Sequence, residues 1–252
     1  MITHISAVVL AKNNEATIEK TLQALREFED VVVYDNGSTD RTISIAESFS
    51  NIYLVNGEFN GFGWTKNTAV SFAENDWILI VDSDEVVDSE LLQTLKTTPL
   101  DNNTVYILNF TAYYKEIQVK FCGWNNQKIK RLYNKTFTKY NANDVHEDII
   151  TEGLQTQLLQ GNMQHYSYQS IEQFVNKANT YSTLFAKNNV GKKSSSPTKA
   201  FFNGLYSFIK TYIFKQGFRD GYVGLVIAFS HFVTNFYKYI KLYEMNKELK
   251  KR

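Results

Sequence analysis

The chain of 252 residues has a single cysteine, Cys122, and only two prolines. One thiol excludes an internal disulfide framework and a cysteine-rich zinc site, and it favours a reducing compartment. The opening segment MITHISAVVLAKNNE lacks the basic head, apolar core and small-residue cleavage site of a signal peptide. We therefore expect the chain to begin with a β-strand and the protein to be cytoplasmic.

Long apolar runs are also missing. In the aromatic C-terminal region the longest stretch without a charged residue is 221–237, whose 17 residues include glycine, serine, histidine, threonine and asparagine. A membrane-spanning helix needs about 20 predominantly apolar residues. We therefore predict no transmembrane helix.

The small net charge of +1 conceals an uneven distribution. From Lys199 to the end of the chain, ten basic side chains stand against three acidic ones, so the preceding part is acidic. The region between Phe201 and Tyr243 also holds 14 of the 37 aromatic residues. Because the basic groups lie among aromatic ones and the remainder is acidic, nucleic acid is not an expected partner.

Strands and helices alternate over the first hundred residues. Stretches with helical periodicity separate apolar runs typical of buried strands, which we place at 4–11, 30–36, 51–56 and 76–85. This alternation predicts an α/β fold with a mostly parallel sheet, whose ligands bind beyond the carboxyl ends of the strands. After Leu100 the pattern becomes β-rich, and a further helix is expected over 170–188.

A Ser-, Lys- and Gly-rich segment at 188–199 is the obvious linker. It separates an expected catalytic domain, 1–190, from a helical, aromatic and basic region, 198–252. The latter carries an apolar stripe with lysines nearby, at Phe201, Leu205, Phe208 or Ile209, and Tyr212 or Ile213. Such a stripe either lies on an anionic membrane surface or packs against the catalytic domain, and the sequence leaves both alternatives open.

Three carboxylates, Asp82, Asp84 and Glu85, follow the apolar run WILIV directly. Like charges packed together raise one another's cost of ionisation, and a shared cation would remove that cost. The pair Asp82 and Asp84 suits Mg²⁺ or Mn²⁺, ions that keep coordination positions open for substrate phosphates. The alternative is a pair of solvated acids in a turn.

Other candidate side chains lie near the same predicted edge or later in the chain. Asp35 ends the second predicted strand, where it could bind a base or ribose, or shape an Asx turn with Asn36 and Gly37. Lys66 could contact a phosphate or be a solvated helix residue. Arg131 could balance a diphosphate, and His165 could contact a metal or phosphate, although ordinary structural roles are open for both.

The segment NDVHEDI, 143–149, gathers Asp144, Glu147 and Asp148 around His146. Transfer of a group to a hydroxyl needs a general base within hydrogen-bond reach, and a carboxylate can serve. The segment is otherwise a charged loop.

The order of the segments SAVVLAKNNE, VVVYDNGSTDRT, GFGWTKNTA, ILIVDSDE, GWNNQKIKRLYNK, DVHE and HYSY resembles family-two glycosyltransferases of GT-A fold. Within that family the chain looks most like the small lipopolysaccharide-core glucosyltransferases that add β-glucose to a heptose, and the similarity runs over nearly the whole chain. It implies an inverting transferase with a UDP-glucose donor, Mg²⁺ or Mn²⁺, and a lipid-linked glycan acceptor. It also implies peripheral association with the inner face of the bacterial cytoplasmic membrane.

The resemblance also assigns roles to residues. Asp82 and Asp84 would hold the metal, and Glu147 would be the base, with Asp144 the second candidate. Many relatives have a Glu-Asp pair where this chain has His146, Glu147 and Asp148, so the choice of base stays open. The implied nucleotide-sugar-binding residues are Ala11, Asn13, Glu15, Asp35, Lys66, Asp82 and Arg131.

Three other functions compete with this one. A nucleotidyltransferase on a similar sheet would open with a glycine- and arginine-rich phosphate loop, but LAKNNEATIEK contains no glycine. A non-catalytic lipid-surface binding module would not need the intact Asp-x-Asp and the candidate base. A GT-A-like transferase for another surface glycan remains compatible with every motif.

Overall fold

The computed structural model describes residues 1–141 and 147–251, and the chain divides into two compact units. Unit 1 consists of Met1–Thr111 and Asn126–Tyr166. Unit 2 consists of Ala112–Asn125 and Ser167–Arg252. This division differs from the expected domains 1–190 and 198–252, because the helix expected over 170–188 groups with the C-terminal helices.

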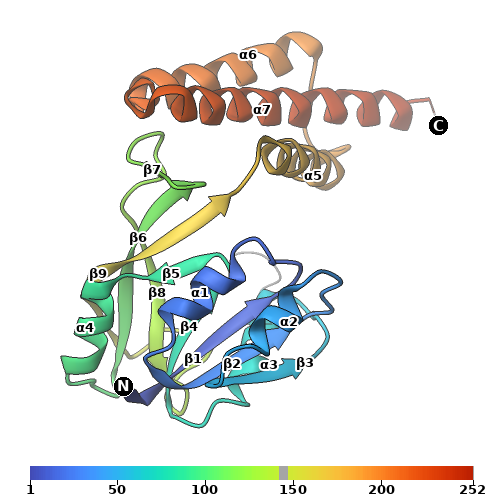
Figure 1. Ribbon diagram of the computed structural model, residues 1–252. Coiled ribbons are helices and arrows are strands. Elements are labelled where there is room, and N and C mark those ends of the chain that lie inside the picture. The colour runs from blue at the N-terminus through green and yellow to red at the C-terminus, as the bar shows by residue number, and fades with distance from the viewer. Residues whose placement is uncertain (142–146, 252) are drawn as a thin grey trace. The chain divides into compact units, whose positions relative to one another are not determined.

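The first half of unit 1 alternates strands and helices as the sequence predicts (Figure 1). Its elements are β1 (Ile2–Ala11), α1 (Ile18–Ala24), β2 (Phe28–Asp35), α2 (Thr42–Ala46), β3 (Ile52–Asn56), α3 (Phe62–Val70) and β4 (Trp77–Asp82). The β-rich part that follows consists of β5 (Glu85–Val87), α4 (Ser89–Thr97), β6 (Thr104–Tyr114), β8 (Gln127–Asn134) and β9 (Gln155–Tyr168).

These strands form one sheet in the order β3-β2-β1-β4-β8-β6-β9-β5. Parallel pairing joins β3 to β2, β2 to β1 and β1 to β4. Antiparallel pairing joins β4 to β8, β8 to β6 and β9 to β5. The predicted α/β fold is confirmed, with a parallel half formed by the first four strands and an antiparallel half formed by β8, β6, β9 and the short β5.

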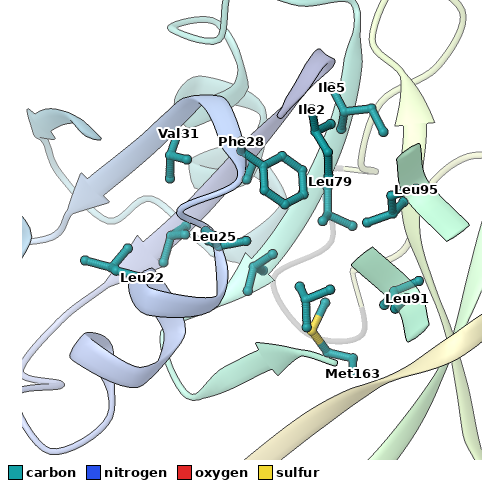
Figure 2. Packing of buried hydrophobic residues seen from close by; sticks show 14 of the residues in the cluster. Ile2, Ile5, Leu22, Leu25, Phe28, Val31, Leu79, Leu91, Leu95 and Met163 are labelled. Atoms are coloured by element: carbon teal, nitrogen blue, oxygen red, sulfur yellow. The ribbon is translucent and has the colours of Figure 1, made fainter. Parts of the chain in front are cut away.

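Successive residues of the central strands point to opposite faces of the sheet, so each face has its own core. On β1, Ala7 and Val9 pack with α1, α2 and α4, whereas Val8 and Leu10 pack with α3. Figure 2 shows the first of these clusters, in which Leu22 and Leu25 from the α1 region and Leu91 and Leu95 from α4 meet the strand side chains. A continuous apolar run is therefore buried on both sides.

Unit 2 is mainly helical. After β7 (Ile117–Val119), which pairs with the end of β6, it contains α5 (Ile171–Asn189), α6 (Pro197–Ile209), a π-helical turn η1 (Lys210–Phe214), a 3₁₀ turn η2 (Gly217–Asp220) and α7 (Gly221–Leu249). Helices α6 and α7 lie side by side (Figure 1). No helix in 1–141 or 147–251 has the length and apolar character to cross a bilayer.

Serine side chains begin both helices that flank the predicted linker. Ser170 Oγ accepts the backbone N–H of Gln173 at the start of α5, and Ser196 Oγ accepts that of Lys199 at the start of α6. Pro197 occupies the first turn of α6, where its missing N–H costs nothing. The linker is therefore reduced to the short segment 190–196 between two capped helices.

The predicted apolar stripe of the C-terminal region is only partly a packing surface. Ala200 and Gly204 are the buried positions of α6. The neighbouring aromatic side chains Phe201, Phe202 and Tyr206 are 47%, 60% and 61% exposed. The small residues of α6 therefore make its buried contacts, and aromatic groups remain on the surface.

Candidate active site

A pocket of about 370 Å³ opens at the carboxyl ends of β1 and β4, the edge where ligands are expected. Its lining residues are Leu10, Ala11, Lys12, Asn14, Asn36, Phe59, Phe62, Asp82 and Ser83. Asp82 is the last residue of β4 and its side chain is 38% exposed, so it presents a carboxylate to this pocket. Asp82 therefore lies at the edge of the sheet where the sequence predicts that ligands bind.

Behind Asp82, carboxylates and cations alternate in one connected network. Arg131 Nη2 lies 2.7 Å from Asp82 Oδ2 and 2.5 Å from Glu85 Oε1. Lys66 Nζ lies 3.9 Å from Asp82 Oδ1 and 2.9 Å from Glu147 Oε1. Since Lys66 and Arg131 are both buried, their ion pairs are weakly screened by water.

The network separates the protonation behaviour of two neighbouring carboxyl groups. Desolvation by the surrounding protein would by itself raise the pKa of Asp82, but the charges of Arg131 and Lys66 hold that pKa well below its usual range. Burial raises the pKa of Glu85 to about 7, against the attraction of Arg131, and the negative charge of Asp82 adds to that rise. Asp82 is therefore the more readily ionised member of the pair.

A close approach of backbones brings Lys66 to Glu147. A Cβ added to Gly63 on α3 would lie 2.0 Å from the carbonyl oxygen of Asn141, so only glycine allows this contact. The side chain of Asn67, one turn later, donates to the Tyr140 carbonyl at 2.9 Å and accepts the Tyr140 N–H at 3.0 Å. These contacts fix α3 against Tyr140 and Asn141.

Asp84 faces His165 across neighbouring strands. The pairing of β5 with β9 sets Glu85 opposite His165, and the Tyr166 N–H donates to the Asp84 carbonyl at 2.8 Å. His165 Nε2 then lies 3.4 Å from Asp84 Oδ2, with the two side chains 34% and 29% exposed. Partial burial lowers the pKa of His165, but the hydrogen bond and charge of Asp84 outweigh it, so the net shift is upward.

Two side chains near Asp82 can supply donor atoms to a Mg²⁺ or Mn²⁺ ion. Such ions are commonly held by one or two side chains with water and substrate phosphates completing the shell, at about 2.1 Å per bond. Asp84 Oδ2 and His165 Nε2, 3.4 Å apart, are close enough to share one ion. Both oxygens of Asp82 already face cations. Over the described part of the chain no group of three metal-ligating side chains occurs.

Three residues expected at the nucleotide hold the loops around the pocket together. Asp35 accepts the N–H groups of Gly37 and Ser38 at 2.8 Å each and the Ser38 hydroxyl at 2.5 Å, which is the Asx turn considered from the sequence. Asn13 Oδ1 accepts the Thr39 N–H at 2.7 Å. Glu15 Oε2 lies 3.2 Å from Arg41 Nε. These bonds tie the end of β1 to the loop after β2.

The structure therefore brings some predicted residues together and leaves others apart. Lys66, Asp82, Arg131 and Glu147 form the charged network, and Ala11 lines the pocket. Arg131 is engaged by Asp82 and Glu85 rather than facing the pocket as a free cation. Asp144 and His146 lie outside the described residues.

Sequence reasoning missed the aromatic wall of the pocket. Phe59 and Phe62 line it with their rings 5.0 Å apart in an edge-to-face arrangement, and they are 46% and 50% exposed. The available signal was the position of two phenylalanines in a glycine-containing loop that leads into a helix at the ligand edge. The buried role of Glu85 was also missed, since it looked like one more acid of the turn.

Sequence comparison places the chain among known enzymes. A match to "Glycosyl transferase family 2" spans residues 6–152, which is more than half of the chain. The chain belongs to this family. The matched segment contains the second half of β1, all of β2 to β4, the acid cluster at Asp82 and the base candidate Glu147.

Relatives cover almost the whole length of this family 2 chain. An uncharacterized glycosyltransferase of Rickettsia typhi is 32% identical over 258 residues, which covers 96% of this chain and 87% of that protein. The lipopolysaccharide core biosynthesis glycosyltransferase LpsC of Rhizobium meliloti is 24% identical, over 95% of this chain and 92% of that protein. Among solved structures, S. aureus TarS aligns with a TM-score of 0.48 and 17% identity, over 85% of this chain and 45% of that one.

Proposed function

We propose that this family 2 glycosyltransferase moves glucose from UDP-glucose onto a heptose of a lipopolysaccharide or lipooligosaccharide inner core, with inversion to a β linkage. The observation that carries the chemistry is the pocket at the ends of β1 and β4, with Asp82 and Phe62 in its lining and Lys66 and Glu147 behind Asp82. The similarity to LpsC over 95% of the chain supports the acceptor class.

Glu147 is the base in this proposal. Lys66 holds Oε1 of Glu147 at 2.9 Å, and the Glu147 side chain is 19% exposed. In this proposal Oε2 faces the acceptor hydroxyl. As the new bond forms between the acceptor oxygen and the anomeric carbon, the bond to the diphosphate oxygen breaks and its electron pair leaves with UDP. The hydroxyl proton passes to Glu147. Lys66 orients this carboxylate and offsets the negative charge of the site.

Asp84 and His165 are the residues we propose to hold a Mg²⁺ or Mn²⁺ ion. Asp82, already neutralised by Arg131 and Lys66, would accept hydrogen bonds from the donor instead. A bound ion at Asp84 would supply charge stabilisation for the leaving diphosphate. Asp35, Asn13 and Glu15 would keep the loops that flank the nucleotide in place.

We also propose that unit 2 associates with the cytoplasmic face of the inner membrane, where a lipid-linked acceptor would be reached. The support is the row of exposed aromatic side chains, in particular Phe202, Tyr206 and Phe214, the last being 73% exposed. Exposed aromatic groups with nearby lysines bind interfacial lipid.

The direct test is to incubate the full chain with UDP-glucose, Mn²⁺ and a core oligosaccharide that ends in heptose. Mass spectrometry should show the gain of one hexose, and proton NMR should show a β-anomeric coupling. Glu147→Gln should bind UDP normally but lose about a thousandfold or more in turnover, as expected for removal of a general base. Asp148→Asn, at the neighbouring carboxylate, is the matched control and should stay active.

Three results would overturn parts of the proposal. If Asp144→Asn is inactive and Glu147→Gln is active, the base is Asp144. If Asp84→Asn and His165→Gln both keep the Mn²⁺ dependence of the unmodified chain, the ion is held elsewhere. A product with another sugar or acceptor would place the enzyme in the synthesis of a different surface glycan.

A further inference from the structure

A second cavity, of about 590 Å³, lies wholly within unit 2, between the loop that joins α5 to α6 and the last turns of α7. Its lining residues are Gly191, Lys192, Lys193, Ser194, Ser195, Tyr243, Asn246, Lys247, Leu249 and Lys250. Four of them are lysines, and no lining residue is acidic. We call this the basic cavity.

Hydrogen bonds from α7 hold the loop wall of the basic cavity in one conformation. Asn246 Oδ1 accepts the Gly191 N–H at 2.8 Å, and its amide nitrogen donates to the Lys193 carbonyl at 2.8 Å. Ser195 donates its hydroxyl to the Tyr239 carbonyl at 2.7 Å. Gly191 adopts φ +73°, a conformation that most side chains disfavour. The cavity is therefore shaped by the fold rather than by a loose surface loop.

The positive charge of the basic cavity exceeds what the helix ends require. Helices α5 and α7 both end at this place, and each helix terminus carries about half a unit of negative charge. Lys192 interacts with the carboxyl end of α5, since its Nζ donates a hydrogen bond to the Asn188 carbonyl at 3.2 Å. Lys193, Lys247 and Lys250 take part in none of the salt bridges found over the described residues. Four lysine charges against about one unit of negative charge from the two helix termini leave a surplus of about three positive charges in the lining.

We propose that the basic cavity binds a phosphate group of a phosphate ester. Lysine ammonium groups are strong point-charge partners for phosphate, and the Ser194 hydroxyl and backbone groups of the loop add hydrogen-bonding capacity. Tyr243 and Leu249 give the same cavity an apolar wall for the organic part of the ester. The lipid headgroup of an anionic phospholipid and a soluble phosphate ester share this chemistry.

This site is separate from glycosyl transfer. Every residue that lines the basic cavity belongs to unit 2, whereas the pocket lined by Asp82, and the Lys66 and Glu147 side chains behind it, belong to unit 1. Loss of phosphate binding is therefore expected without loss of UDP binding, and an incorrect donor or acceptor assignment would leave the phosphate site unaffected.

The test uses the full chain at low ionic strength and three variants. The first, Lys193→Gln/Lys247→Gln/Lys250→Gln, removes three cavity charges and spares Lys192. The second is a charge-matched control at exposed lysines outside the cavity, Lys115→Gln/Lys120→Gln/Lys128→Gln. The third, Asn246→Ala, keeps every charge but releases the loop. Binding of glycerol 3-phosphate is measured by calorimetry, and co-sedimentation is measured with phosphatidylcholine vesicles that contain phosphatidylglycerol.

We expect glycerol 3-phosphate to bind tenfold or more weakly to the cavity triple variant and to Asn246→Ala, and normally to the control. With vesicles, a lysine near an anionic surface contributes about fivefold, so a lipid headgroup as ligand predicts about 100-fold weaker co-sedimentation of the cavity triple variant. Weakened glycerol 3-phosphate binding with unchanged co-sedimentation would assign the site to a soluble ester. Equal losses in the cavity and control variants, or no loss in Asn246→Ala, would overturn the proposal, because diffuse surface charge would then explain the binding.

Discussion

The ammonium group of Lys66 lies 2.9 Å from Oε1 of Glu147 although 81 residues separate them in the chain. Lys66 is 4% exposed. Among the described residues it is the only cation within 4 Å of Glu147, and it is one of two cations, with Arg131, that pair with Asp82. Removing a buried charge leaves its partners as carboxylates without a compensating cation, in a place where water solvates them poorly. The stability of the site and its chemistry therefore depend on the same side chain.

Replacing Lys66 by methionine should destabilise unit 1 by about 2–4 kcal/mol, because Asp82 and Glu147 then lose a compensating charge. Lys130→Met is the matched control. Lys130 also pairs with a carboxylate, that of Asp148 at 2.7 Å, but this pair is more exposed and should contribute less than about 1 kcal/mol. Urea unfolding measures both values. Equal effects of the two substitutions would contradict the importance of burial at Lys66.

Arg131 and Glu85 should behave as a coupled pair. Glu85 is 1% exposed, and Arg131 supplies its nearest positive charge while also contacting Asp82. Arg131→Met alone should cost about 3–5 kcal/mol, because it strands buried carboxylates. In the double variant Arg131→Met/Glu85→Gln, the amide oxygen can still accept the Asp82 N–H, which now donates to Glu85 at 2.8 Å.

The double variant should therefore recover at least about 1 kcal/mol relative to Arg131→Met, a coupling that a double-mutant cycle of urea unfolding measures. Glu85→Gln alone completes the cycle. Additive effects within about 0.5 kcal/mol would show that Arg131 stabilises Asp82 and not Glu85.

Local patterns accounted for the secondary structure and for the edge at which the site forms. The apolar runs became β1 to β4, and the acids after Val81 lie at the carboxyl ends of the strands, because burial on two faces demands uninterrupted apolar residues. The contact between Lys66 and Glu147 could not be foreseen. It depends on the approach of α3 to Asn141 at Gly63, for which nothing within either segment gives a signal.

The contact between Asp84 and His165 likewise could not be predicted from the sequence. The sequence singled out both residues, but only the antiparallel register of β5 with β9 sets them face to face. Register depends on which strands meet, and β5 has just three residues with which to specify it. The position of α5 in unit 2 was missed for a similar reason, because a helix pattern shows which face is apolar but not which neighbour covers it.

Gly224 should be intolerant of any side chain. A Cβ at this position of α7 would lie 1.7 Å from the carbonyl oxygen of Gly217, a backbone atom that cannot rotate away. Gly224→Ala should therefore destabilise unit 2 by about 3 kcal/mol despite the better helix propensity of alanine. Gly204→Ala on α6 is the control. Its Cβ would be 3.1 Å from the Phe232 carbonyl oxygen, so the contact cost and the propensity gain should roughly cancel. Thermal or urea unfolding of the two variants compares them, and equal stabilities would refute the steric argument.

His231 should make unit 2 sensitive to acid. Burial, together with Lys215 and Lys238, lowers the pKa of His231 to about 4, and its Nδ1 lies 2.8 Å from the Thr211 hydroxyl. The folded state therefore favours the neutral ring. As the pH falls from about 6.5 towards 4, the unfolded chain binds a proton that the folded chain does not, so stability falls with pH. Over that window the loss should reach about 3 kcal/mol, and above pH 6.5 this group should have no effect.

The substitution His231→Asn keeps a group that can bond Thr211 but removes the titration. Its stability relative to the unmodified chain should therefore improve steadily between pH 6.5 and 4.5, as measured by urea unfolding at several pH values. His4→Asn, at an exposed histidine of β1, is the matched control and should run parallel to the unmodified chain over the same range. A constant difference between His231→Asn and the unmodified chain from pH 7.5 to 4.5 would mean that the imidazole is protonated inside the fold, and that Lys215 and Lys238 do not exclude the charge.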